Sequence, residues 1–318
     1  MVIAPAGTPN AGTVYVANPG IFGKGRDGNT VTAIKPDGVT STITVGDVPE
    51  GMVIAPLGTP NAGTLYVSNY GNNGAGNTVS VVRPDGTIST FTISGQTPSP
   101  PAVAPTGTPN AGTVYVIGKS GDSGILTVLL PTGGVKTSAA AVGYCGQGVV
   151  IAPLGTPHAG SVYVCDEGPA SSGGEAGGEG STVTEIRPDG TTTMIAVGKG
   201  AGGVAIAPAG TPNAGTIYVA NVGSYAKPGN TISTVAPDGT TATLAVGTQP
   251  GLPVIAPKGT PNAGSVYVAN NLRGNGSTVT VIETDGRIKT VATGLDFRSY
   301  EGTRWGLTCW FAFCSDVA

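Results

Sequence analysis

Residues 52–93 read MVIAPLGTPNAGTLYVSNYGNNGAGNTVSVVRPDGTISTFTI, and the fold follows from this segment. It contains four short runs of β-branched, aliphatic and aromatic residues, at 52–55, 64–68, 78–82 and 89–93. Such residues favour strands because they pack well on a pleated surface. Between the runs lie GTPNAG, a glycine-rich loop and PDG, whose residues preset turn dihedrals. The segment therefore predicts four antiparallel strands joined by two tight turns and one longer loop.

The same two-part pattern recurs six times along the chain. Its first proline stands at Pro5, Pro56, Pro105, Pro153, Pro208 and Pro257. Its second turn stands at Asp37-Gly38, Asp85-Gly86, Gly133-Gly134, Asp189-Gly190, Asp238-Gly239 and Asp285-Gly286. A period of roughly 40–50 residues with four strands is typical of a β-propeller blade. We predict an all-β, six-bladed β-propeller with four antiparallel strands per blade, and keep a β-solenoid as the alternative.

The six repeats divide the chain almost without remainder. We expect blades at about 1–46, 47–95, 96–143, 144–198, 199–247 and 248–294. Residues 295–318 break the pattern and hold both tryptophans, Trp305 and Trp310. A segment this aromatic is too apolar for a solvated linker. We expect this tail to cap the propeller, to close it, or to supply a strand that binds a partner.

The composition excludes several classes of protein. Gly (54) and Pro (26) together make up a quarter of the 318 residues, but they recur in the same turns, so they separate strands rather than indicate disorder. Only 10% of residues are charged and no Lys/Arg cluster exists, which argues against a nucleic-acid partner. No apolar run approaches the roughly 20 residues that span a bilayer. We therefore expect no membrane span.

The loops between the second and third strands are the variable part of the repeat. They comprise residues 19–28, 70–76, 119–122, 167–180, 222–229 and 271–276. In a propeller they lie on one face, which we call the variable face, whereas the GTPNAG and PDG turns lie on the opposite, constant face. Variable loops on a rigid scaffold are where binding usually resides. We predict any ligand on the variable face and in the adjoining axial channel.

A polar residue ends the second strand in five of the six repeats: Asn18, Asn69, Asp166, Asn221 and Asn270, with Gly118 in the third. One interpretation is a ring of oxygen ligands for Ca²⁺. The other is that each side chain caps the turn into its own loop. The loop that begins at Asp166 and Glu167 also holds Glu175 and Glu179. It is either a Ca²⁺ clamp or a solvated insertion, and we predict no other cofactor.

His158 is the only histidine and belongs to the constant face. The other five repeats have Asn at this position, so we interpret His158 as a tolerated turn substitution. No triad or zinc spacing accompanies it, and we predict no catalytic residue.

Cys145 and Cys165 fall on neighbouring strands of the fourth blade. They either form a disulfide, which would indicate an oxidising compartment, or remain unpaired thiols.

The strings Tyr-Val-Ala-Asn at 15–18, 218–221 and 267–270, each followed by Asn-Thr or Ser-Thr and then Pro-Asp-Gly or Thr-Asp-Gly, resemble the YVTN and NHL families of β-propeller repeats. The resemblance covers nearly the whole chain except the tail. It implies a propeller fold and admits surface-layer proteins, sensor ectodomains, protein-binding scaffolds and, in related propellers, lyases and lactonases. The Pro-bearing GTPNAG turn departs from both families.

Three functions remain open at this point. The first is a non-catalytic scaffold that binds a protein, a glycan or a surface component through the variable face, at Asn18, Asn69, Asp166, Glu167, Asn221 and Asn270. The second is a metal-dependent lactonase or lyase with an axial site, and the third is a structural surface-layer protein. We expect a monomer at an extracellular or cell-surface location, with a leader absent from this chain, because Met1 leads directly into a strand.

Overall fold

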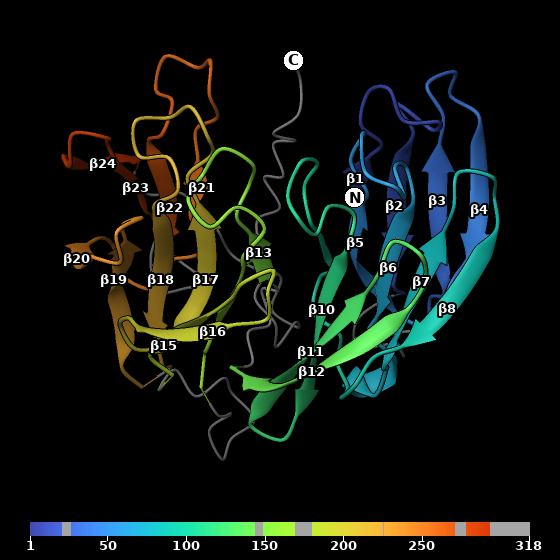
Figure 1. The fold of residues 1–318 in the computed structure, drawn as a ribbon, viewed down its shortest axis with the longest axis horizontal. Coiled ribbons are helices and arrows are strands. Elements are labelled where there is room, and N and C mark those ends of the chain that lie inside the picture. The colour runs from blue at the N-terminus through green and yellow to red at the C-terminus, as the bar shows by residue number, and fades with distance from the viewer. Residues whose placement is uncertain (21–26, 144–148, 169–179, 225, 271–277, 293–318) are drawn as a thin grey trace. The chain divides into compact units, whose positions relative to one another are not determined.

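The computed structural model describes residues 1–20, 27–143, 149–168, 180–224, 226–270 and 278–292, and almost all its regular structure is β-strand (Figure 1). The strands form six four-stranded sheets. We call these sheets blades 1 to 6 in chain order. In each blade the strands are hydrogen-bonded in the order in which they occur in the chain, and every pairing that is described is antiparallel. The chain divides into two compact units, whose described parts are residues 1–141 and 142–292.

The first unit holds blades 1 to 3. Blade 1 consists of β1 (Val2–Ile3), β2 (Val14–Asn18), β3 (Thr30–Ile34) and β4 (Thr40–Thr44). Blade 2 consists of β5 (Pro49–Ile54), β6 (Leu65–Asn69), β7 (Thr78–Val82) and β8 (Ile88–Thr92), with a 3₁₀ turn, η1 (Asn72–Gly74), between β6 and β7. Blade 3 consists of β9 (Ala102–Val103), β10 (Val114–Ser120), β11 (Ser123–Leu129) and β12 (Val135–Val142), the last of which ends at the boundary between the units.

The second unit holds blades 4 to 6. Blade 4 consists of β13 (Val149–Ile151), β14 (Val162–Cys165), β15 (Thr182–Ile186) and β16 (Thr192–Ala196). Blade 5 consists of β17 (Ala201–Ile206), β18 (Ile217–Gly223), β19 (Pro228–Val235) and β20 (Thr241–Ala245). Blade 6 consists of β21 (Val254–Ile255), β22 (Val266–Asn270), β23 (Thr278–Ile282) and β24 (Ile288–Ala292). The tail 295–318 lies outside the described residues, so its role stays a prediction.

The repeated turns have the local chemistry that the sequence predicts. In the PDG turn of blade 2, the Asp85 Oδ1 atom accepts the Thr87 N–H at 2.8 Å, and Gly86 has φ +86°, a conformation that costs glycine little. In the GTPNAG turn of the same blade, the Thr59 hydroxyl donates to the Pro56 carbonyl at 2.8 Å. The Asp85 carboxylate and the Thr59 hydroxyl therefore each bind a backbone group of their own turn.

The GTPNAG turn also joins consecutive blades. The Asn10 Nδ2 atom of blade 1 donates both to its own Tyr15 hydroxyl and to the Gly63 carbonyl of blade 2, each at 2.9 Å. The same pair of bonds links blade 2 to blade 3 and, in the second unit, blade 5 to blade 6; the donors are Asn61 and Asn213, and the carbonyls are those of Gly112 and Gly264.

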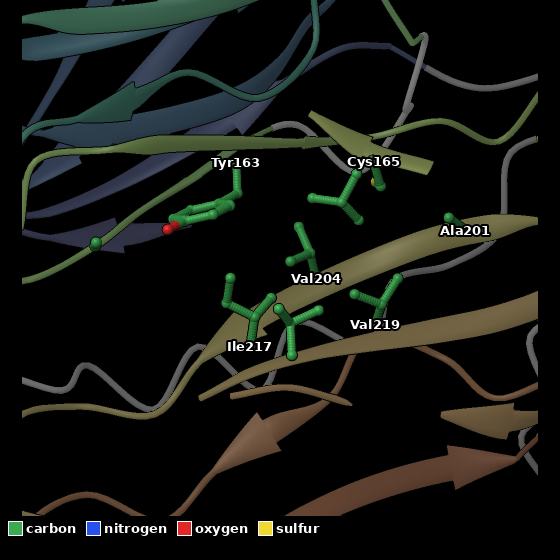
Figure 2. Close-up of a cluster of buried hydrophobic side chains, with 9 residues drawn as sticks. Tyr163, Cys165, Ala201, Val204, Ile217 and Val219 are labelled. Carbon is green, nitrogen blue, oxygen red and sulfur yellow. The ribbon is translucent and has the colours of Figure 1, made fainter. Parts of the chain in front are cut away.

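The hydrophobic core lies between neighbouring blades. One cluster packs Tyr163 and Cys165 of β14 against Val204 of β17 and Val219 of β18 (Figure 2). Similar clusters join blades 1 and 2, 2 and 3, and 5 and 6. Because both faces of an inner strand are covered, β6 is buried at all five positions, whereas β8 is mostly exposed. No helix among the described residues is long and apolar enough to cross a membrane.

Candidate functional site

The asparagines that end the second strands serve their own blades. In each of four blades the Nδ2 atom donates to two hydroxyls of the third strand. The pairs are Asn18 with Thr30 and Thr32, Asn69 with Thr78 and Ser80, Asn221 with Thr231 and Ser233, and Asn270 with Thr278 and Thr280, at 2.8–3.1 Å. The amide hydrogens therefore bind across the sheet, and not to the loop backbone as the capping interpretation expects. Their role in binding a ligand stays a prediction.

The preceding blade also packs against the asparagine that ends the second strand. A Cβ placed on Gly46, after β4, would lie 2.5 Å from Asn69 Cγ, and the Gly46 N–H donates to the Ser80 hydroxyl at 3.1 Å. Gly198 stands in the same relation to Asn221 and Ser233. At the junction of blades 2 and 3 the sizes are exchanged: Ser94 replaces the glycine and Gly118 replaces the asparagine, while the Ser94 N–H still donates to a third-strand hydroxyl, that of Thr127. At these junctions the sizes of the two facing residues are complementary, so that consecutive blades pack closely.

The acidic loop of blade 4 is described only at its edges. The Asp166 Oδ1 atom accepts the Gly168 N–H at 3.0 Å, and Glu167 is buried. Glu175 and Glu179 lie outside the described residues, so the Ca²⁺ clamp stays a prediction. In the part of the chain that the structure describes, no three His, Cys, Asp or Glu residues gather as metal ligands would.

Cys165 is buried at the end of β14 and is disulfide-bonded. Cys145, the predicted partner, lies outside the described residues, as do the two cysteines of the tail. The pairing with Cys145 therefore stays a prediction.

A pocket of about 280 Å³ opens beside the 70–76 loop of blade 2. It is lined by Asp47, Asn69, Gly71, Asn72, Ala75 and Gly76. The loop is tightly folded, because a Cβ on Gly71 would lie 2.3 Å from the Gly76 nitrogen. Backbone bonds hold the loop to the segment that enters blade 2: the Gly71 N–H donates to the Asp47 carbonyl and the Tyr70 N–H to the Val48 carbonyl. The pocket is therefore a property of the fold. Its reachable polar groups come from Asp47 and Asn72, since Asn69 is only 2% exposed.

A second polar cluster, around His158, was not predicted from the sequence. His158 Nδ1 lies 2.8 Å from the Glu185 Oε1 atom, which also accepts the Tyr163 hydroxyl at 3.0 Å and lies 3.5 Å from Arg187 Nε. The Glu185 side chain is 4% exposed. Burial, and then the neighbouring carboxylate, raise the pKa of Tyr163.

His158 is therefore more than a tolerated turn substitution. Its backbone has φ +58°, which none of the asparagines at the same turn position of the other repeats shares. Glu185 is the only acidic residue at its position in the third strand, where the other repeats carry Ala33, Val81, Val128, Thr234 and Val281. The two residues that differ from the repeat, His158 and Glu185, therefore contact each other. The available signal was an acidic residue at a position where the other repeats carry Ala, Val or Thr.

No family model matches the chain, and no curated protein matches it. Among solved structures, it is similar to a functionally unknown protein from Desulfotomaculum acetoxidans DSM 771, with 15% identity, a TM-score of 0.54 and coverage of 83% of this chain and 76% of the other. It is also similar to a streptogramin B lyase, with 13% identity, a TM-score of 0.53 and coverage of 87% and 86%. At these identities the likeness concerns the fold alone. With the six four-stranded sheets, it confirms the predicted fold class: the chain is an all-β, six-bladed β-propeller with four antiparallel strands per blade.

Proposed function

We propose that this protein is a non-catalytic β-propeller scaffold that binds a glycan through the variable face of blade 2. The pocket beside the 70–76 loop carries the proposal. Its volume of about 280 Å³ lies just below the range for sites of drug-sized ligands, roughly 300–1,000 Å³, which suits one sugar unit of a larger chain.

The chemistry of the pocket suits hydroxyl groups. The Asp47 carboxylate accepts hydrogen bonds, and the Asn72 amide both accepts and donates them. Both residues are exposed, so a ligand can reach them without displacing the core. The backbone bonds at Gly71 and Tyr70 keep the loop in place, and a preformed site avoids the cost of ordering on binding.

An extracellular location accompanies this proposal. The disulfide at Cys165 supports it, because disulfides persist in oxidising compartments. A glycan on a cell surface or in a matrix is accessible there.

A glycan array followed by titration calorimetry tests the proposal. We expect Asp47→Asn and Asn72→Ala each to weaken binding of the best monosaccharide about tenfold, since each removes hydrogen bonds to the ligand. Asp37→Asn is the matched control, because Asp37 is an exposed aspartate in a PDG turn, away from this pocket. An array with no binder, or binding that Asp47→Asn and Asn72→Ala leave unchanged, would contradict the proposal.

A further inference from the structure

Blades 1 and 4 carry corresponding cross-strand rows of side chains, which differ most on the third strand. In blade 4 the row is Tyr163, Glu185 and Thr193, on β14, β15 and β16. In blade 1 it is Tyr15, Ala33 and Ser41, on β2, β3 and β4. A cation follows the third strand in both blades: Arg187 in blade 4 and Lys35 in blade 1. Blade 1 therefore has the tyrosine and the cation of the blade 4 row, but not its carboxylate.

Blade 4 shows what this row can hold. The Glu185 carboxylate accepts the Tyr163 hydroxyl at 3.0 Å and lies 3.5 Å from Arg187 Nε. A carboxylate is thus held by a tyrosine hydroxyl, by the cation and by His158 Nδ1 at 2.8 Å, although it is 4% exposed; blade 1 has Asn10 in place of His158. The Glu185 side chain thus occupies the place that the carboxylate of a bound ligand could take.

In blade 1 the corresponding space is open. Ala33 has the smallest side chain at this position of the six repeats. A groove of about 500 Å³ between blades 1 and 2 is lined by Tyr15, Ala33, Lys35, Ile43, Val82 and Arg83, among others. Its apolar wall, from Ile43 and Val82, can cover the body of a small molecule.

The polar groups of the groove favour an anion. Lys35 and Arg83 both line it, one from each blade, and none of the described residues that line it is acidic. Among the described residues neither cation forms an ion pair; Arg83 donates to the Ser89 hydroxyl at 3.3 Å. The Tyr15 hydroxyl accepts from Asn10 at 2.9 Å, which leaves its own hydrogen free to donate, as that of Tyr163 does to Glu185.

We propose that this groove binds the carboxylate of a small organic acid with an apolar body. The carboxylate takes the place that Glu185 occupies in blade 4, between the Tyr15 hydroxyl and Lys35, with Arg83 on the other wall. The site lies at the GTPNAG turn of blade 1 and the PDG turns of blades 1 and 2, and it shares no lining residue with the proposed glycan pocket.

Benzoate is a suitable probe, and titration calorimetry with chemical-shift mapping on the full chain is the assay. We expect binding in the millimolar range, weakened by salt because both cations are exposed. Benzamide, which has the same ring without the charge, should bind at least tenfold more weakly. Equal binding of benzoate and benzamide, or no binding of benzoate at tens of millimolar, overturns the proposal.

Three variants locate the site. Ala33→Val introduces the residue that blade 2 carries at Val81, so it should fold normally and fill the cavity. Ala33→Glu supplies a tethered carboxylate, as in blade 4, and should abolish benzoate binding. Lys35→Gln should weaken it about tenfold. Lys258→Gln, an exposed lysine outside the groove, is the control and should have no effect. Benzoate affinity that Ala33→Val and Lys35→Gln leave unchanged in folded protein contradicts the assignment.

Discussion

His158 and Glu185 can each be replaced by the residue that other repeats carry, and the structure predicts how the free energy of unfolding changes. His158→Asn restores the turn residue of the other five repeats, and Glu185→Val restores the third-strand residue of blade 2. We expect each single change to destabilise the protein and the double change to recover most of the loss.

The magnitudes come from the contacts. His158→Asn withdraws the imidazole that lies 2.8 Å from a carboxylate with 4% exposure. A hydrogen bond to a charged group contributes about 1.5–3 kcal/mol. We expect a loss near 1.5 kcal/mol, because His158 itself is 40% exposed and solvent compensates part of it.

Glu185→Val leaves the Tyr163 hydroxyl without its acceptor, at a cost of about 1 kcal/mol. In the double variant the new asparagine can donate to Tyr163 as Asn10 does to Tyr15 at 2.9 Å. Asn and Val are also the residues that blade 2 carries at these two positions, Asn61 and Val81, where Asn61 donates to the Tyr66 hydroxyl at 2.7 Å. The double variant should therefore lie within about 1 kcal/mol of the original protein.

Urea unfolding, followed by fluorescence and extrapolated to water, measures the four proteins of this double-mutant cycle. The coupling energy should exceed about 1 kcal/mol, with unchanged denaturant slopes. Losses that add within about 0.5 kcal/mol would refute the idea that the two residues act as one unit.

Two further predictions concern the blade junctions and acid stability. Gly46→Ala should lower the free energy of unfolding by about 1–3 kcal/mol, because its Cβ would lie 2.5 Å from Asn69 Cγ. The double variant Gly46→Ala/Asn69→Gly should recover much of this stability, because it exchanges the sizes of the two residues as Ser94 and Gly118 do at the next junction. Thermal unfolding compares the variants, and a double variant no more stable than Gly46→Ala would contradict the idea that the two residues fit each other. In four PDG-type turns, hydrogen bonds hold the pKa of the aspartate below its ordinary value of 3.8; the aspartates are Asp85, Asp189, Asp238 and Asp285, and the donors are Thr87, Thr191, Thr240 and Arg287. The stabilising effect of these carboxylates is therefore complete above that pH and is lost as the pH falls below it. Replacing all four by Asn should flatten the acid side of the stability curve below about pH 4, and an unchanged acid profile would contradict this.

The strands and turns could be predicted because their causes are local. The strand that the sequence places at 78–82 is β7 (Thr78–Val82), since the β-branched run ends one residue before the Pro-Asp-Gly turn. The run at 89–93 is shifted by one residue, to β8 (Ile88–Thr92). Ends of strands depend on which backbone groups find partners, and short runs of similar residues do not specify this.

The site was harder to predict because its members are far apart in the chain. Asn69 has the expected position, but its amide partners, Thr78 and Ser80, depend on the register of β6 with β7. Glu185 could have been noticed as an acidic residue at a position where the other repeats carry Ala, Val or Thr. That it meets His158 follows only from the pairing of β14 with β15, which places Glu185 opposite Tyr163.

The period of the repeat and its turn chemistry were enough to establish an all-β chain of six four-stranded blades, because glycine, proline and aspartate recur in the turns that separate the strand runs. Packing between strands and between blades was needed for the rest. It joins His158 to Glu185, exchanges the sizes of Ser94 and Gly118 across one junction, and leaves a groove where Ala33 replaces a larger side chain. These features depend on the space and the partners around a residue, and a repeated sequence specifies neither until its copies are packed together.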